Sequence, residues 1–152
     1  MSNAVEFISL IYKVDEEYKI ERVRGIKDGD FYQIKEVPLF SSNLALDDIV
    51  SVEREGEHLF FEKVIKPSGH SVIHVAILKP NVSTDILASL RLYEIAIYAV
   101  KNNIYLALDI PPRVAYRSIK KYLDNQLQLG NLEYQEASIS TEHNYLGDFL
   151  SN

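Results

Sequence analysis

The stretch KPSGHSVIHVAIL, Lys66 to Leu78, divides the chain into two patterns and so decides how the fold is interpreted. It opens with a Pro-Ser-Gly-His corner typical of a turn and continues into an apolar run typical of a strand. Short alternating segments precede the corner, and strands interleaved with helical patterns follow it. The sequence predicts two packed halves, residues 1–70 and 71–139, and a C-terminal tail over 140–152.

The first half shows the period of two that predicts half-buried strands. Val5 to Val14 alternates in this way, and further strands are expected over 18–26, 31–37, 48–55 and 58–65. Gly29 and Gly56 lie at the turns between them, where a positive φ is needed. We therefore expect a small, antiparallel, barrel-like sheet.

The second half follows the order βαββαβ. Strands are expected over 72–78, 95–101, 104–110 and 132–139, and helices over 83–94 and 112–129. Ser83 is the expected N-cap of the first helix, and Pro112 the expected first residue of the second. This order predicts an α+β protein whose second half is ferredoxin-like, with its first and third strands central.

The central strands predict which residues contact the helices. Five apolar side chains should point toward them: Ile73, Val75, Ile77, Leu106 and Leu108. His74, Tyr105 and Asp109 should lie on the opposite face with Ala76 and Ala107. The simplest expectation is that this opposite face packs on the strands of the first half.

Composition limits the classes of function. The chain has 152 residues, a formal net charge of −6 and no cysteine. The negative charge disfavours nucleic acid and favours a basic protein partner. The absence of cysteine excludes thiolate chemistry and disulfides, and no apolar run is long enough for a membrane span. We expect a cytoplasmic protein, with its oligomeric state left open.

No strong catalytic or cofactor motif occurs in the sequence. The four histidines, at positions 58, 70, 74 and 143, lack the close spacing of metal ligands. His70 is expected to be a turn residue that caps nearby backbone. We expect no enzyme, no metal and no cofactor.

Acidic residues form the leading candidate for a binding surface. They lie in predicted turns and on outward strand faces: Asp47, Asp48, Glu53, Glu55 and Glu57. Such carboxylates would steer a basic partner, while exposed rings such as Phe40 and Phe60 would anchor it. The leading hypothesis is an immunity or antitoxin protein that masks a basic bacterial toxin domain.

A small-molecule sensor is the alternative hypothesis. The face that carries His74, Tyr105 and Asp109 could line a ligand pocket between the two halves. Rings on neighbouring central strands also occur in RNA-recognition modules, but the third strand, NIYLALDI, lacks their basic and multiply aromatic pattern.

Four segments carry a resemblance to a known family. They are Val37-Pro38-Leu39-Phe40, Asp47-Asp48-Ile49-Val50, Ser68-Gly69-His70-Ser71-Val72 and Ala107-Leu108-Asp109-Ile110-Pro111-Pro112. In order and spacing the chain resembles an uncharacterised bacterial family, domain-of-unknown-function family 4265, from about Glu6 to Ala137. It departs from that pattern at Asp47, where the family usually has Gly, and at Val72 and His74, where it has Thr and often Arg. The resemblance implies an architecture and carries no activity.

Overall fold

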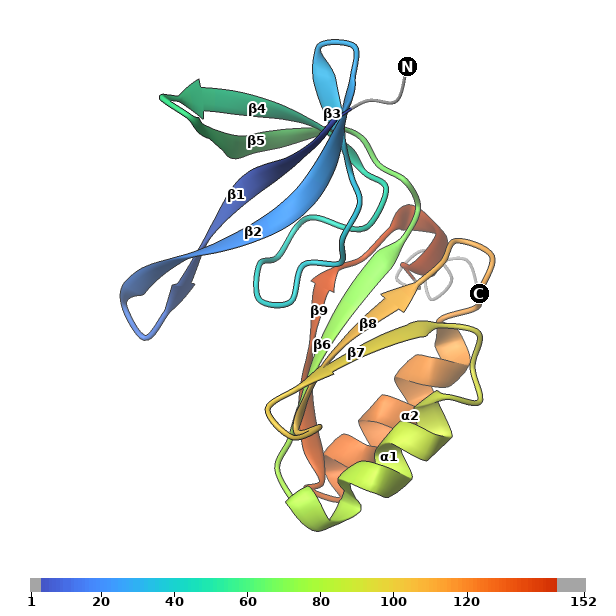
Figure 1. Cartoon of the computed structure of the whole chain (residues 1–152). Helices are drawn as coiled ribbons and strands as arrows, with labels where there is room; N and C mark the ends of the chain where they lie inside the picture. Colours follow the sequence, from blue (N-terminus) through green and yellow to red (C-terminus); the bar gives the residue numbers. More distant parts are fainter. Residues whose placement is uncertain (1–3, 145–152) are drawn as a thin grey trace.

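The computed structural model describes residues 4–144. Two sheets form the molecule: a closed five-stranded barrel and a four-stranded sheet with two helices on one face (Figure 1). The protein is thus mostly β, and the predicted α+β class holds at this level. β5 (His58–Lys66) ends and β6 (Ser71–Ile77) begins on either side of the Ser68-Gly69-His70 corner.

The barrel contains β1 (Val5–Val14), β2 (Glu17–Asp28), β3 (Phe31–Ile34), β4 (Ile49–Glu55) and β5. Alternate residues point inward as the period of two requires, so Ile8, Leu10 and Val23 are buried in its core. One prediction is wrong. β1 and β5 close the barrel as a parallel pair, through Ile8–Leu59 and Ser9–Phe60, so the barrel is not wholly antiparallel.

The second sheet has the strand order β7-β8-β6-β9, with β7 (Ala96–Val100), β8 (Tyr105–Ile110) and β9 (Leu132–Ser138). β6 and β8 are its central strands, as predicted. α1 (Ser83–Leu90) and α2 (Arg117–Gln128) cover one face (Figure 1). The five apolar side chains expected beneath the helices, Ile73, Val75, Ile77, Leu106 and Leu108, all belong to the buried core there. No described helix is long and apolar enough to cross a membrane.

The helix starts differ from the predictions for identifiable reasons. A 3-10 turn over Pro80–Val82 leads directly into α1, so Val82 occupies the cap position predicted for Ser83. α2 begins at Arg117 rather than Pro112 because residues 111–116 form a turn. The carbonyls of Pro111 and Val114 in that turn both accept from Nε2 of His143, at 3.1 and 2.9 Å.

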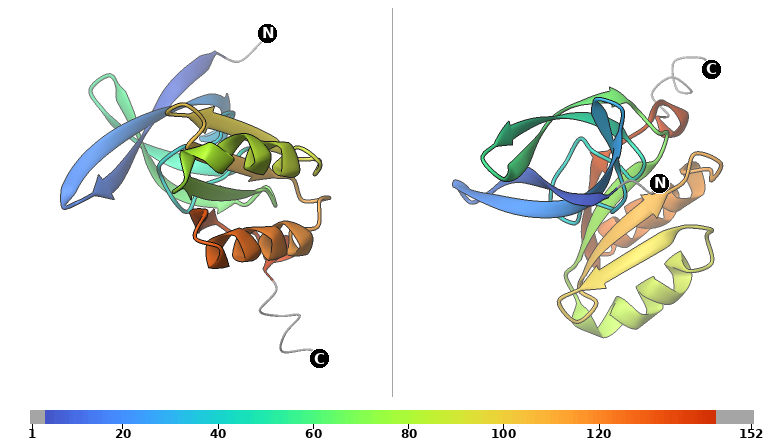
Figure 2. Two further views of the ribbon diagram at one scale, coloured as in Figure 1. Left: turned by 90° about the horizontal axis from the view of Figure 1, so that it is seen from below. Right: turned by 45° about the horizontal axis from the view of Figure 1, so that its top comes forward.

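The loop from Lys35 to Asp48 lies between the two sheets (Figure 2). Val37 and Ala45 from this loop pack against Val72, Ala107 and Ala137 of the second sheet. The face opposite the helices is therefore covered by this loop, and not by the strands of the barrel as expected. The loop joins the two halves into one structure.

Candidate functional site

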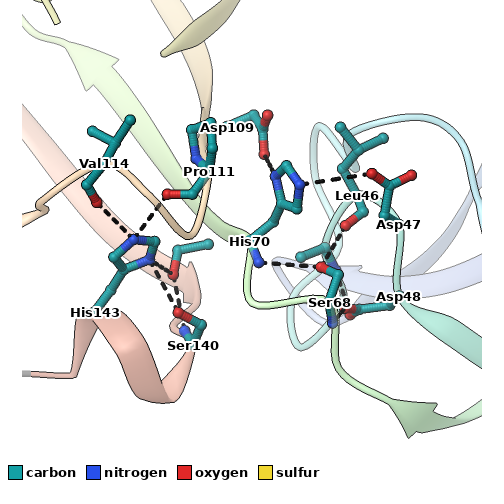
Figure 3. A network of polar contacts seen from close by, with 12 residues as sticks. Leu46, Asp47, Asp48, Ser68, His70, Asp109, Pro111, Val114, Ser140 and His143 are labelled. Carbon is teal, nitrogen blue, oxygen red and sulfur yellow. Dashed lines mark hydrogen bonds and ion pairs between the residues drawn. The ribbon is translucent and has the colours of Figure 1, made fainter. Parts of the chain in front are cut away.

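Four polar side chains meet at the corner between the halves: Asp47, Ser68, His70 and Asp109 (Figure 3). Nδ1 of His70 lies 2.8 Å from Oδ1 of Asp109, and its Nε2 lies 3.7 Å from Oδ2 of Asp47. Burial raises the pKa of Asp109, while the hydrogen bond from His70 opposes that rise. His70 is therefore held between one carboxylate from the second sheet and one from the loop.

This corner has the parts of a catalytic triad in the wrong arrangement. The hydroxyl of Ser68 donates to the carbonyl of Leu46 at 2.6 Å and accepts from the backbone N–H of His70. The ring nitrogens of His70 face two carboxylates, so the ring is not placed to take a proton from the Ser68 hydroxyl. These contacts fix the conformation of the corner and leave the Ser68 hydroxyl without a base that could activate it.

A second polar cluster surrounds His143 (Figure 3). The hydroxyls of Ser71 and Ser140 lie 2.6 and 3.0 Å from Nδ1 of His143, and Nε2 donates to the turn before α2. His143 is buried, and both its nitrogens are engaged. The predicted tail over 140–152 therefore begins with an anchored segment through Asn144, and its remainder lies outside the described residues.

Glu21 of β2 fixes the middle of the loop to the barrel. Its carboxylate accepts from the backbone N–H groups of Leu39, Phe40 and Ser41, at 2.6, 3.1 and 3.0 Å, and from the Ser41 hydroxyl at 2.9 Å. Four donors on one carboxylate form a charge-assisted cluster that holds the loop in one conformation.

The same loop is fixed to the second sheet by the two rings predicted to line a ligand pocket. Burial lowers the pKa of His74, so the neutral ring donates from Nε2 to the carbonyl of Pro38 at 3.0 Å. Burial raises the pKa of Tyr105 to about 12, and its hydroxyl donates to the carbonyl of Leu39 at 2.7 Å. Nε2 of His74 and the hydroxyl of Tyr105 thus hold the loop.

The structure separates the three residues of the predicted ligand pocket. His74 and Tyr105 line a hollow of about 210 Å³ with Gln135. Asp109 lies at the His70 corner, four residues along β8 from Tyr105 and so about 13 Å away. The prediction that all three residues line a single pocket is therefore wrong.

The predicted acidic surface also divides. Asp48 is buried, where it accepts from the backbone N–H groups of Ala45 and Ser68 at 2.9 and 2.8 Å. Asp47 pairs with Lys35 at 2.8 Å, and Phe40 stacks between Tyr12 and Tyr105. All three residues help to hold the loop. Asp48 is too buried to meet a partner, whereas Phe40 stays 37% exposed, so a partner-binding role for Asp47 and Phe40 remains a prediction.

The remaining predicted residues share the β4–β5 hairpin. Glu53, Glu55 and Glu57 are exposed, and Glu53 lies directly opposite the partly buried Phe60. This hairpin projects from the barrel to the same side as the longer β1–β2 hairpin (Figures 1 and 2). Four of the seven predicted partner-binding residues therefore lie together on one projecting element, and their role in binding remains a prediction.

The β1–β2 hairpin was not among the predicted binding elements. Its outer part, residues 10–24 and here called the arm, extends beyond the pairs that join it to β5 and β3. Six of the thirteen exposed large hydrophobic side chains in the described residues lie on this hairpin: Val5, Phe7, Ile11, Val14, Tyr18 and Ile20. The signal was present as alternating residues that are apolar on both faces of β1, which a strand with one solvated face does not need.

A groove of about 480 Å³ lies beside the arm. Leu10 to Lys13 of β1 line one side, Phe40 to Leu44 of the loop line the other, and Phe61 and Gln135 complete it. Among the described residues, no group of three or more His, Asp or Glu side chains could hold a metal ion.

Comparison with known proteins places the chain in a family. The sequence model described as "Domain of unknown function (DUF4265)" matches residues 21–134. The chain belongs to the DUF4265 family. Within this DUF4265 chain, three of the four resembling segments meet at the corner in Figure 3, through Asp47-Asp48, Ser68-Gly69-His70 and Asp109.

A solved structure shares the fold of this DUF4265 chain. It is titled "Novel crystal structure of a hypothetical protein from Neisseria gonorrhoeae" and matches with a TM-score of 0.78 and 30% sequence identity. The match covers 92% of this chain and 96% of that chain. No curated protein matches the sequence.

Proposed function

We propose that this protein is a non-enzymatic binding protein whose partner docks on the projecting hairpins of the barrel. The observation that carries the proposal is the exposed apolar stripe on the β1–β2 hairpin. Ile11 lies directly opposite Ile20, and the two side chains are 59% and 53% exposed. Phe7, on the same face of β1, is 59% exposed. A two-stranded ribbon is marginal alone, and exposed apolar patches mark interaction sites.

Lys13 and Arg22 flank the stripe on its own face, and the acidic groups lie farther out at the ends of the two hairpins. Asp15, Glu16 and Glu17 form the exposed tip of the arm, and Glu53 and Glu55 lie on the neighbouring hairpin. With the net charge of −6, these carboxylates favour a basic protein surface and disfavour phosphate backbones. In its most concrete form, the protein is a cytoplasmic immunity protein that neutralises a basic bacterial toxin domain.

A growth assay tests this proposal. The C-terminal domain of the protein encoded immediately upstream is expressed in a bacterial host, alone and with this protein. Rescue by the wild type, with loss of rescue in the Ile11→Ser/Ile20→Ser double variant, is the expected result. Leu92→Ser is the matched control, because Leu92 is 86% exposed and lies far along the chain beyond α1. A neighbour that is harmless, or equally toxic in both cultures, would overturn the immunity function.

Charge reversal tests the role of the β4–β5 hairpin. Glu53→Lys/Glu55→Lys should weaken rescue and reduce the salt dependence of partner binding, since exposed charges act mainly on the association rate. Glu94→Lys, an exposed acid beyond α1, is the control. Equal salt dependence in both variants would exclude this hairpin from the interface.

A small-molecule sensor remains the alternative function. Because His74, Tyr105 and Asp109 do not share one pocket, we place its ligand in the groove beside Tyr12 and Phe40. The groove volume of about 480 Å³ falls in the range of ligand sites and favours this alternative. A ligand should then raise the melting temperature of the wild type.

We also propose that the βαββαβ half is ferredoxin-like, which the central positions of β6 and β8 support.

A further inference from the structure

β1 and β5 separate shortly after they close the barrel. Their pairing consists of Ile8–Leu59 and Ser9–Phe60, although β1 continues to Val14 and β5 to Lys66. From Leu10 to Val14, β1 pairs with β2 on one edge only, and no described backbone group bonds its other edge. A row of unpaired N–H and C=O groups of this kind is a template for another strand.

The groove of about 480 Å³ lies along this free edge. Its floor is the open end of the barrel core, where Leu10 and Leu44 are buried and Phe61 is partly buried. Tyr12 of β1 and Phe40 of the loop stack at 5.5 Å, so aromatic rings from the two sides of the groove meet there. The groove therefore combines a backbone edge with an apolar floor, which are the two elements that strand addition requires.

The far wall of the groove is preformed. The Glu21 carboxylate fixes residues 39–41, and the backbone N–H of Asn43 donates to the carbonyl of Ala137 at 2.8 Å. Because this wall is already ordered, a segment entering the groove does not have to fix the loop as it binds. The side chains of Ser42, Asn43 and Gln135 line the groove without a described hydrogen-bond partner, so they can bond the backbone of that segment.

We propose that the groove receives one extended peptide segment of the partner, which adds as a strand to the free edge of β1. Alternate side chains of the segment point to opposite faces, so every second one meets the floor of Leu10, Leu44 and Phe61 and must be apolar. The five residues Leu10 to Val14 span about 17 Å, which sets the length of the paired segment. This inference rests on the proposed function and names the mode by which the partner is recognised.

A phage-displayed library of linear random peptides tests the inference without a known partner. Selection on the wild-type protein should enrich sequences with apolar residues at alternate positions. Ser42→Trp should weaken binding of a synthetic copy of the best sequence by about tenfold or more, because the indole fills the groove. Ala88→Trp, on the exposed side of α1, should bind as the wild type does. Equal melting temperatures of the two variants would show that the loss is not unfolding.

Hydrogen exchange of the backbone distinguishes strand addition from side-chain binding. The bound peptide should slow exchange of amides within Leu10 to Val14 that are unpaired in the free protein. Failure to enrich peptides that Ser42→Trp excludes, or unchanged exchange over this stretch, would overturn the inference. Peptides that bind as expected while the growth assay shows no neutralisation would refute the immunity function and leave this site in place.

Discussion

Replacing Glu21 by alanine should destabilise the protein far more than the loss of one surface carboxylate normally does. The Glu21 carboxylate accepts from three backbone N–H groups and one hydroxyl of residues 39–41. Alanine leaves the N–H groups of Leu39 and Ser41 unpaired in a partly buried place, where each costs about 1–3 kcal/mol. The N–H of Phe40 is exposed and can bond water instead, so this third N–H adds no comparable cost. We expect a loss of about 3 kcal/mol in the free energy of unfolding.

Urea and thermal unfolding followed by circular dichroism measure this loss. For a chain of this length, about 3 kcal/mol lowers the melting temperature by about 6–12 °C. Glu17→Ala is the matched control, because it removes the same charge from an exposed position of the same strand. Glu21→Gln keeps one carbonyl oxygen and should fall between the two. If Glu21→Ala loses no more stability than Glu17→Ala, the loop is not held by this carboxylate and the reasoning fails.

Three further changes test the core and the junction. Burial keeps His74 neutral, so its pKa in the folded state lies below the unfolded value of about 6.5. The free energy of unfolding should therefore fall as the pH drops below about 6.5 toward that lower pKa, and His74→Gln should remove this part of the pH dependence. Gly69→Ala should cost about 1–3 kcal/mol in urea unfolding, because φ is +94° and the added Cβ would lie 2.9 Å from Cγ of Pro112; an unchanged midpoint would contradict this. Leu108→Ala should cost about 2–5 kcal/mol, because the side chain is fully buried beneath the helices, and a smaller loss would mean that the core collapses around the gap.

Periodicity predicted the elements because burial on one face is a local property of a strand or helix. β1 spans the predicted Val5–Val14, and Ile73, Val75 and Leu106 face the helices as expected. The start of α2 could not be predicted in this way. The turn before it is held by His143, which lies far along the chain and shows no local sign of that contact.

The candidate site was harder to predict because neighbouring acids can have opposite environments. Asp47 and Asp48 are adjacent, yet the first lies at the surface of the corner and the second is buried against Ala45 and Ser68. Only the path of the loop decides between these environments. The exposed stripe of Ile11 and Ile20 was only partly predictable. The sequence shows apolar residues on both faces of β1, but it does not show where the barrel ends and which of those faces is left exposed.

The loop from Lys35 to Asp48 determines whether the two halves of the protein can be separated. It belongs to the barrel by sequence, yet Val37 and Ala45 complete the packing of the second sheet. Cutting the chain at the Ser68-Gly69-His70 corner would leave the first fragment with a bare apolar loop and the second with an uncovered face. We therefore expect that neither half folds stably when it is expressed without the other.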